Sequence, residues 1–246
     1  MIIKNKLYNR SVELLFNEFR HAYFLEGKPI PSVTKILGVI NKPALVNWAA
    51  GQVVDFLKEQ LQPGVAYDEI QLQTMLEEAR KAHYKKKTDA AGYGTFMHGY
   101  VEKYIKGEKP AMPVHEGLAE AVKKFHVWEA EHNVKFILSE QVIFSKTYQY
   151  SGTLDFVATI DGRLVLGDLK TSSGIYDEMW LQVAAYRLAR SEEFPNEKYD
   201  DQAILRIGKD GSFEFKMAGR YEEDAQAFLS ALNLYNALER MKVNES

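Results

Sequence analysis

Cysteine is absent from the 246-residue chain, and its absence excludes several kinds of site at once. Without thiols the chain forms no disulfides, no thiolate zinc sites and no cysteine-ligated iron–sulfur clusters. No apolar run reaches the roughly 18 residues that a membrane helix needs, and the first residues lack the apolar core of a signal peptide. We therefore expect a soluble, cytoplasmic protein without a membrane partner.

An excess of positive charge is missing as well, since 31 lysines and arginines stand against 34 acidic residues and leave a formal net charge of -3. This balance argues against a generally basic coat for nucleic acid but leaves room for a local basic patch. Such a patch lies between Arg80 and Lys109, where eight basic residues accompany three acidic ones. It is either the solvated face of a helix or a contact for nucleic-acid phosphates.

The stretch from Glu140 to Lys170 is the part of the chain around which the rest is organised. Runs rich in valine, isoleucine, phenylalanine and leucine are separated there by Lys146–Gln149 and by Asp161-Gly162. Asp-Gly between apolar runs is a strong hairpin signal. The pattern therefore predicts three strands in an antiparallel meander, of which the first covers Phe136 to Ser145.

The second turn fixes the pairing of the last two strands. A two-residue loop at Asp161-Gly162 places Ile160 opposite Arg163. Because paired positions then run outward in step from the loop, Asp155 is expected directly opposite Asp168. The two acidic residues would thus face each other across neighbouring strands.

The first turn adds a third carboxylate to this pair. A loop at Lys146–Gln149 places Glu140 opposite Asp155. Lys170 follows Asp168 by two residues, and because side chains alternate between the faces of a strand it points to the same side. The sequence therefore predicts a row of three carboxylates with a lysine beside it.

Such a row needs a counter-charge, because like charges that face each other across strands repel. A divalent cation supplies one, since hard cations such as magnesium prefer carboxylate and carbonyl oxygens. The alternative is a solvated polar face with one surface salt bridge, which is the commoner arrangement of charges on strands. The agreement of register, acid count and adjacent lysine favours the metal site.

Helices and short strands surround the meander, and no internal repeat is present. A helix between the third and fourth strands implies a right-handed crossover and a parallel pair. The expected elements are short strands within 12–31, helices that begin at Ser32, Pro43 and Asp68, a helix over 117–132, a helix over 176–190, a strand over 203–207, a hairpin strand over 208–216 and a final helix over 221–241.

The helix that begins at Asp68 carries a one-sided apolar stripe, which we interpret as core packing. Gly92 and Gly94 are expected to break this helix, and Thr95 to cap a new one that carries His98 and Glu102 on one face. The stripe consists of Ile70, Leu72, Met75, Leu76 and Ala79.

Five motifs in one order along the chain resemble the PD-(D/E)XK nuclease superfamily, in particular its RecB-like branch. Two N-terminal motifs, His21-Ala22-Tyr23 and Pro31-Ser32-Val33-Thr34, also resemble phage exonucleases and the mitochondrial genome maintenance exonuclease. Together the motifs extend the resemblance over most of the chain. The five motifs are Gly94-Thr95 with His98, then Glu140, Gly152-Thr153-Leu154-Asp155, Asp168-Leu169-Lys170, and Gln182 with Tyr186.

The resemblance implies an α/β fold with a restriction-endonuclease-like core. In that core a three-stranded antiparallel meander is followed by a helix and a further strand, and an N-terminal β-hairpin and helical region precede it. We accordingly divide the chain into residues 1–91, a hairpin and helical clamp packed on the core, and residues 92–246, the nuclease core.

The resemblance also implies a metal centre that uses Mg²⁺ or Mn²⁺, with one or two ions. Asp155, Asp168 and the backbone carbonyl of Leu169 would hold the metal, with His98 as a further ligand. Imidazole is an uncommon ligand for magnesium and suits softer metals better. We therefore expect manganese to support activity at least as well as magnesium.

The same resemblance assigns catalytic roles to four further side chains. Lys170 would lie beside the attacking water, and Glu140 would bind or orient a water on the metal. Gln182 and Tyr186 would position the scissile phosphate or shape its pocket. With the two metal-binding aspartates, these residues form the predicted catalytic set.

The expected activity is that of a metal-dependent DNA exonuclease that hydrolyses phosphodiester bonds from a single-stranded end. The alternatives are a duplex-end exonuclease of recombination type and a non-catalytic nucleic-acid-binding module of a replication complex that retains the fold. DNA is the expected partner, with a replication or recombination protein as a second. The candidate DNA contacts are Tyr23, Lys85, Lys86, Lys87, Thr171 and Ser172.

Overall fold

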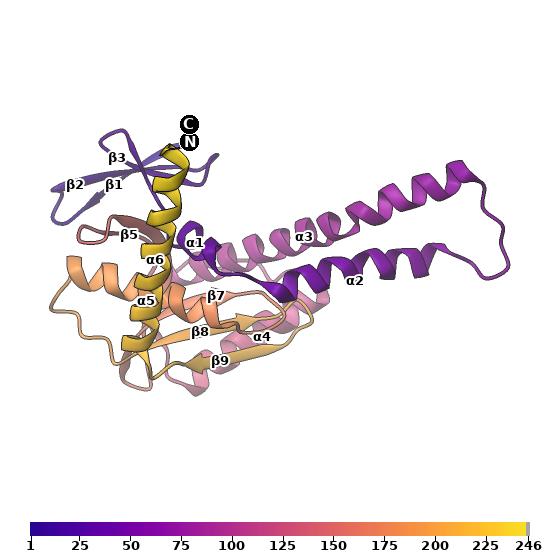
Figure 1. Ribbon diagram of the computed structural model, residues 1–246. Coiled ribbons are helices and arrows are strands. Elements are labelled where there is room, and N and C mark those ends of the chain that lie inside the picture. The colour runs from indigo at the N-terminus through magenta and orange to yellow at the C-terminus, as the bar shows by residue number, and fades with distance from the viewer. Residues whose placement is uncertain (245–246) are drawn as a thin grey trace. The chain divides into compact units, whose positions relative to one another are not determined.

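A computed structural model describes residues 1–244 of the chain (Figure 1). The α/β class predicted from the sequence is confirmed. The chain forms two compact units, one made of Met1–Ile40 with the residues from Met97 onward and the other of Asn41–Phe96. The predicted boundary after residue 91 therefore differs from this division, because the first forty residues group with the C-terminal part. Side chains outside the description are those of Pro43, Ala44, Lys85, Lys87, Asp89, Ala90, Val243 and Asn244.

The larger unit is built on a five-stranded sheet whose strands lie in sequence order, β5-β6-β7-β8-β9. The first three form the predicted antiparallel meander, and β8 pairs in parallel with β7 after the intervening helix α5. The elements are β5 (Lys135–Ser145), β6 (Tyr150–Ile160), β7 (Arg163–Lys170), α5 (Asp177–Glu193), β8 (Asp201–Ile207) and β9 (Phe213–Met217).

The predicted register of the meander is observed at both turns. Ile160 pairs with Arg163 beside the second turn, and the pairing continues in step to Phe156 and Gly167. At the first turn the register is kept from the loop up to and beyond Glu140. The register shift of this hairpin lies between Phe136 and Leu138, and the pairs on either side of Glu140 keep the predicted register.

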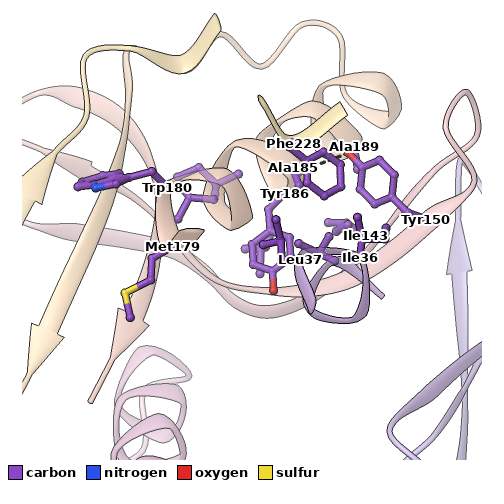
Figure 2. Packing of buried hydrophobic residues seen from close by; sticks show 14 of the residues in the cluster. Ile36, Leu37, Ile143, Tyr150, Met179, Trp180, Ala185, Tyr186, Ala189 and Phe228 are labelled. Atoms are coloured by element: carbon purple, nitrogen blue, oxygen red, sulfur yellow. Dashed lines mark hydrogen bonds between the residues drawn. The ribbon is translucent and has the colours of Figure 1, made fainter. Parts of the chain in front are cut away.

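Helices cover the sheet and close its core. Helix α5 packs with the C-terminal helix α6 (Tyr221–Asn244), and their apolar side chains form a buried cluster with residues of β5 and β6 (Figure 2). Tyr150 is fully buried there, and its hydroxyl donates to the Ala185 carbonyl over 2.7 Å. Helix α4 (Glu116–Glu131) contributes Phe125, whose ring lies 6.0 Å from that of Phe136 on β5.

The short strands predicted within 12–31 are observed, and Ile2–Leu7 adds a further strand that pairs with Val12–Asn17, so the N-terminal segment is a four-stranded antiparallel sheet rather than a single hairpin. The Ser151 N–H on β6 donates to the Pro31 carbonyl over 3.0 Å, which joins this segment to the meander. Ser32 caps the next helix as predicted, with its hydroxyl accepting from the Lys35 N–H. The elements are β1 (Ile2–Leu7), β2 (Val12–Asn17), β3 (Ala22–Leu25), β4 (Lys28–Ile30), α1 (Val33–Ile36) and the 3₁₀ turn η1 (Leu37–Val39).

The smaller unit is a pair of helices, α2 (Pro43–Gln60) and α3 (Glu69–Ile105), of which α3 continues into the larger unit. Asp68 caps α3 as predicted, because its carboxylate accepts from the Gln71 N–H over 2.7 Å. The predicted break at Gly92 and Gly94 is wrong, since α3 runs through both. No helix in the described part of the chain is long and apolar enough to cross a membrane.

The apolar stripe at the start of α3 is not core packing, which corrects the expectation from the sequence. Ile70 is 77% exposed and Leu76 57% exposed, whereas Ala79 is fully buried. Thr95 likewise does not cap a helix, and its hydroxyl donates instead to the carbonyl of Ala91 one turn back. With about 3.6 residues per turn, Ile70 and Ala79 point to opposite sides of α3, so the five residues do not form one covered face.

Candidate metal centre

Three side chains from three elements converge in the larger unit. His98 lies on α3, Glu140 on β5 and Asp155 on β6, and one ligand atom of each lies within 4.8 Å of the other two. His98 Nδ1 is 3.6 Å from Asp155 Oδ1 and 3.8 Å from Glu140 Oε1. All three side chains are half-buried, so the cluster can be reached from solvent.

Glu140 reaches this cluster through an unusual backbone conformation. Its φ angle is 50°, in the left-handed region, although the residue stands within a β-strand. A residue with a Cβ pays about 1–2 kcal/mol for this conformation, and it persists only where the surroundings hold it. Ser139 and Gln141 on either side keep their regular pairing with β6. The strain is therefore confined to the residue whose carboxylate enters the site.

A second group of polar side chains lies beside the cluster and is almost completely paired. Asp168 is 1% exposed, and its Oδ2 lies 2.5 Å from Nζ of Lys170. Lys170 Nζ donates to Gln182 Oε1 over 3.0 Å, while Gln182 Nε2 donates to the Tyr186 hydroxyl over 2.7 Å and to Asp168 Oδ1 over 3.3 Å. The Gln182 amide thus fixes the positions of a lysine, a carboxylate and a phenol.

Two close approaches hold these elements together. The Leu169 N–H donates to Asp155 Oδ2 over 2.6 Å, which leaves Asp155 Oδ1 facing His98. The ring of Tyr186 lies against Gly152 on β6, where an added Cβ would stand 2.6 Å from Tyr186 Cε1. Only glycine at this position allows α5 to approach β6 so closely.

The electrostatics of the site reflect the crowding of acidic groups. Burial and the neighbouring Asp168 raise the pKa of Asp155 to about 8. Burial alone would lower the pKa of His98, but the Asp155 and Glu140 carboxylates outweigh it and raise the pKa to about 9. Burial also opposes the charge of Lys170, yet Asp168 and Asp155 raise its pKa. Without an added cation, protons and the lysine supply the counter-charge.

The residues present fit a divalent cation. Two carboxylates and an imidazole are ligands that first-row metals accept, and the imidazole favours Mn²⁺ over Mg²⁺. Asp168 Oδ2 is buried and faces the Lys170 ammonium at 2.5 Å, so this carboxylate already has a positive partner beside the cluster. His98, Glu140 and Asp155 would hold the ion, with Asp168 beside them.

The structure brings together most of the predicted site residues but groups them differently from the prediction. Glu140, predicted to act through a water, lies among the close ligand atoms with His98 and Asp155. Asp168, predicted as a direct ligand, is turned toward Lys170 and Gln182. The Leu169 residue contacts Asp155 through its N–H, and the predicted role of its carbonyl stays a prediction.

One residue near the site was missed in the sequence. Glu178 lies on the first turn of α5 and contributes to the raised pKa of Lys170. It precedes Gln182 by four residues and Tyr186 by eight, so all three share one helical face. That spacing was the signal in the sequence that could have revealed it.

The candidate DNA contacts lie in three separate parts of the chain. Tyr23 is buried, and its hydroxyl shares a 2.8 Å hydrogen bond with that of Thr153, so its ring cannot stack on a base. Thr171 and Ser172 are half-buried at the end of β7, and the Ser172 hydroxyl donates to the Gly174 carbonyl. The remaining contacts are on α3, where Lys86 is exposed and the side chains of Lys85 and Lys87 lie outside the described part.

No protein-family model matches the chain, and no curated protein sequence matches it. Among solved structures, the chain is similar to one described as the crystal structure of SSO0001, with 12% sequence identity and a TM-score of 0.33. The match covers 78% of this chain and 87% of the other chain. Likeness at this level assigns neither a family nor an activity to the chain.

Metal binding should strengthen as the pH rises, because the ion must displace protons from the ligands. The pKa of His98 is about 9 and the pKa of Asp155 is about 8, and both lie above the ordinary values of these groups. Below those values protons compete with the ion, and above them they do not. Calorimetric titration of Mn²⁺ in two buffers of different ionisation enthalpy should show proton release at neutral pH. Equal affinity at acidic and alkaline pH, without proton release, would contradict this arrangement.

Proposed function

We propose that the protein is a metal-dependent phosphodiesterase that hydrolyses DNA. The observation that carries the proposal is the convergence of His98, Glu140 and Asp155 within 4.8 Å, next to a half-buried lysine that Asp168 and Gln182 hold in place. A cation site beside a fixed ammonium group provides what hydrolysis of a phosphodiester needs, namely compensation for charge that develops on the phosphate oxygens.

The chain's own residues would divide the work. When bound, a divalent ion would supply positive charge at the phosphate and lower the pKa of water. Lys170 would stabilise the negative charge that develops as a water oxygen bonds to phosphorus and the ester oxygen leaves. Gln182 would hold the Lys170 ammonium in position, and Tyr186 would offer its hydroxyl at the edge of the phosphate site. Since the pKa of Tyr186 lies well above its ordinary value, the hydroxyl keeps its proton.

We further propose a PD-(D/E)XK core and an exonuclease that starts from a single-stranded DNA end. The support is the order of elements and motifs: an antiparallel meander with Asp155 and Asp168 on adjacent strands, a helix with Gln182 and Tyr186, and a parallel strand. DNA would be the partner, with a replication or recombination protein as a second. A duplex-end exonuclease and a non-catalytic DNA-binding module are the alternatives that the assay below separates.

The proposal is tested with end-labelled linear DNA, single-stranded and duplex, incubated with the full chain in EDTA, Mg²⁺ or Mn²⁺. We expect release of labelled products from the single strand, no activity in EDTA, and at least as much activity with Mn²⁺ as with Mg²⁺. Faster degradation of the duplex would favour the duplex-end alternative. Binding of DNA without any cleavage in Mn²⁺ would favour the non-catalytic DNA-binding module and contradict the proposed enzymatic activity.

A Lys170→Met variant tests the assignment of the lysine. Methionine keeps the length of the side chain but removes the ammonium that faces Asp168 and Gln182. Hydrolysis should fall by about 10²–10³-fold, the usual loss when one stabilising group is removed, while Mn²⁺ still binds. Activity close to that of the wild type would show that the lysine has no part in catalysis.

A further inference from the structure

The smaller unit, Asn41–Phe96, exposes apolar side chains on both of its helices. Among the described side chains of this unit, three are buried: Gln52, Ala79 and Tyr93. A soluble protein rarely leaves so much apolar surface uncovered unless another molecule packs on it. Large exposed apolar side chains include Leu45, Val46 and Trp48 on α2 and Ile70, Leu76 and Tyr84 on α3.

One exposed row of α3 has the spacing of a coiled-coil seam. Its members follow one another at alternating steps of four and three residues, the period that keeps a seam facing a partner helix. The hydroxyls of Thr74 and Thr88 donate back to the carbonyls of Ile70 and Tyr84, so both threonines present their methyl groups outward. The row consists of Ile70, Thr74, Glu77, Lys81, Tyr84 and Thr88, all of them exposed.

This row is symmetric about Ala79, the buried residue that faces the opposite way. Glu77 and Lys81 are equally far from that centre, and so are Thr74 and Tyr84. An antiparallel copy of the same helix would therefore bring each Glu77 opposite a Lys81, twice, as a two-fold interface requires. The ion pairs of the described residues include neither Glu77 nor Lys81.

The charges along α3 support the same arrangement over a greater length. The charged residues exposed on α3 before Ala79 are acidic, namely Glu69, Glu77 and Glu78, and those that follow it directly are basic, namely Arg80, Lys81 and Lys86. Two copies in antiparallel orientation match acidic half to basic half at both ends. A polyanion such as DNA would be attracted to one half and repelled by the other.

We propose that a second copy of this chain covers the smaller unit, through an antiparallel two-fold contact of α3 centred at Ala79. The contact would bury Ile70 and Tyr84 of each protomer and pair each Glu77 with Lys81 of the other. The α2–α3 helix pairs of the two protomers would then lie together as a four-helix bundle. Apolar faces that are left open in one copy would pack on those of the other. This inference does not depend on the proposed hydrolytic activity.

Reversing the charges of Glu77 and Lys81 in the full chain tests the proposed dimer. Glu77→Lys places lysine against Lys81 in a homodimer, and Lys81→Glu places glutamate against Glu77, so each variant alone should associate about ten-fold or more weakly. A mixture of the two variants restores both pairs and should form a heterodimer as strong as the wild-type dimer. Lys123→Glu, an exposed change of the same size on α4, is the matched control and should leave association unchanged.

Sedimentation velocity over a range of protein concentrations gives the readout, with circular dichroism to verify the folding of each variant. The proposal is supported if the wild type and the control form dimers, if each of the two charge variants dimerises more weakly, and if the mixture of the two variants dimerises as the wild type does. A single-protomer mass for the wild type at every concentration would overturn it. So would dimers that neither charge change affects, or a wild-type chain that associates only after oligonucleotide is added.

Discussion

Asp155→Asn is expected to abolish DNA hydrolysis while the fold stays intact. Asparagine has nearly the same shape, and its carbonyl oxygen can still accept the hydrogen bond from the Leu169 N–H that now reaches Asp155 Oδ2. What is lost is the carboxylate next to His98 and Glu140, on which the proposed cation binding would depend. Because the metal supplies most of the charge stabilisation in such a reaction, activity should fall by at least about 10³-fold.

Two measurements make this prediction specific. Mn²⁺ affinity, measured by calorimetry, should fall together with hydrolysis of linear DNA in Asp155→Asn. Asp161→Asn is the matched control, because it makes the same chemical change at the exposed turn that ends the same strand, where asparagine tolerates the φ of 49°. Full activity in Asp155→Asn, or an equal loss of activity in both variants, would contradict the proposal that Asp155 is a metal ligand.

Gly167→Ala is expected to cause the largest loss of stability by a single methyl group. Gly167 pairs with Phe156 across β6 and β7, next to the acidic residues, and the buried Phe156 ring lies over the glycine. A Cβ on Gly167 would stand 2.0 Å from Phe156 Cζ, far inside van der Waals contact. Since Phe156 is held in turn by the ring of Phe136, overpacking should cost about 2–3 kcal/mol of unfolding free energy.

Urea denaturation of four variants, Gly167→Ala, Gly92→Ala, Phe156→Leu and the double variant, separates the clash from other effects of the substitution. Gly92→Ala lies within α3, where an added Cβ would meet nothing within 4 Å, so it should raise the unfolding free energy. The expected gain is about 0.5–1 kcal/mol, because alanine favours a helix more than glycine does. The double variant Phe156→Leu with Gly167→Ala should be less destabilised than the sum of the two single variants. A Gly167→Ala protein as stable as the wild type would contradict the packing described here.

The sequence was informative where structure is decided locally. The Asp161-Gly162 turn allowed the pairing of Ile160 with Arg163 to be predicted, because a two-residue loop leaves one register. Ser32 and Asp68 cap helices as predicted, since a side-chain acceptor at that position satisfies a free N–H. Once the register is known, the position of Asp155 beside Asp168 follows from strand geometry alone.

The sequence was less informative about features that depend on contacts between residues far apart in the chain. Glycine weakens a helix by only about 1 kcal/mol, so packing elsewhere on α3 can carry the helix through Gly92 and Gly94. The left-handed backbone of Glu140 leaves no mark in a strand pattern, and neither does the contact of Glu140 with His98, which lies on α3. Pairing of Asp168 with Lys170 likewise depends on Gln182, which lies on a helix that follows the strand.

The central claim is that the cluster of His98, Glu140 and Asp155 serves hydrolysis of DNA from an end. Its most direct test compares a linear single strand with a closed circle of the same sequence, each incubated with the wild-type chain and Mn²⁺. Degradation of the linear strand alone, lost in Asp155→Asn, is the predicted result. An intact linear strand would contradict the claim of hydrolysis, and equal degradation of the closed circle would contradict the requirement for an end.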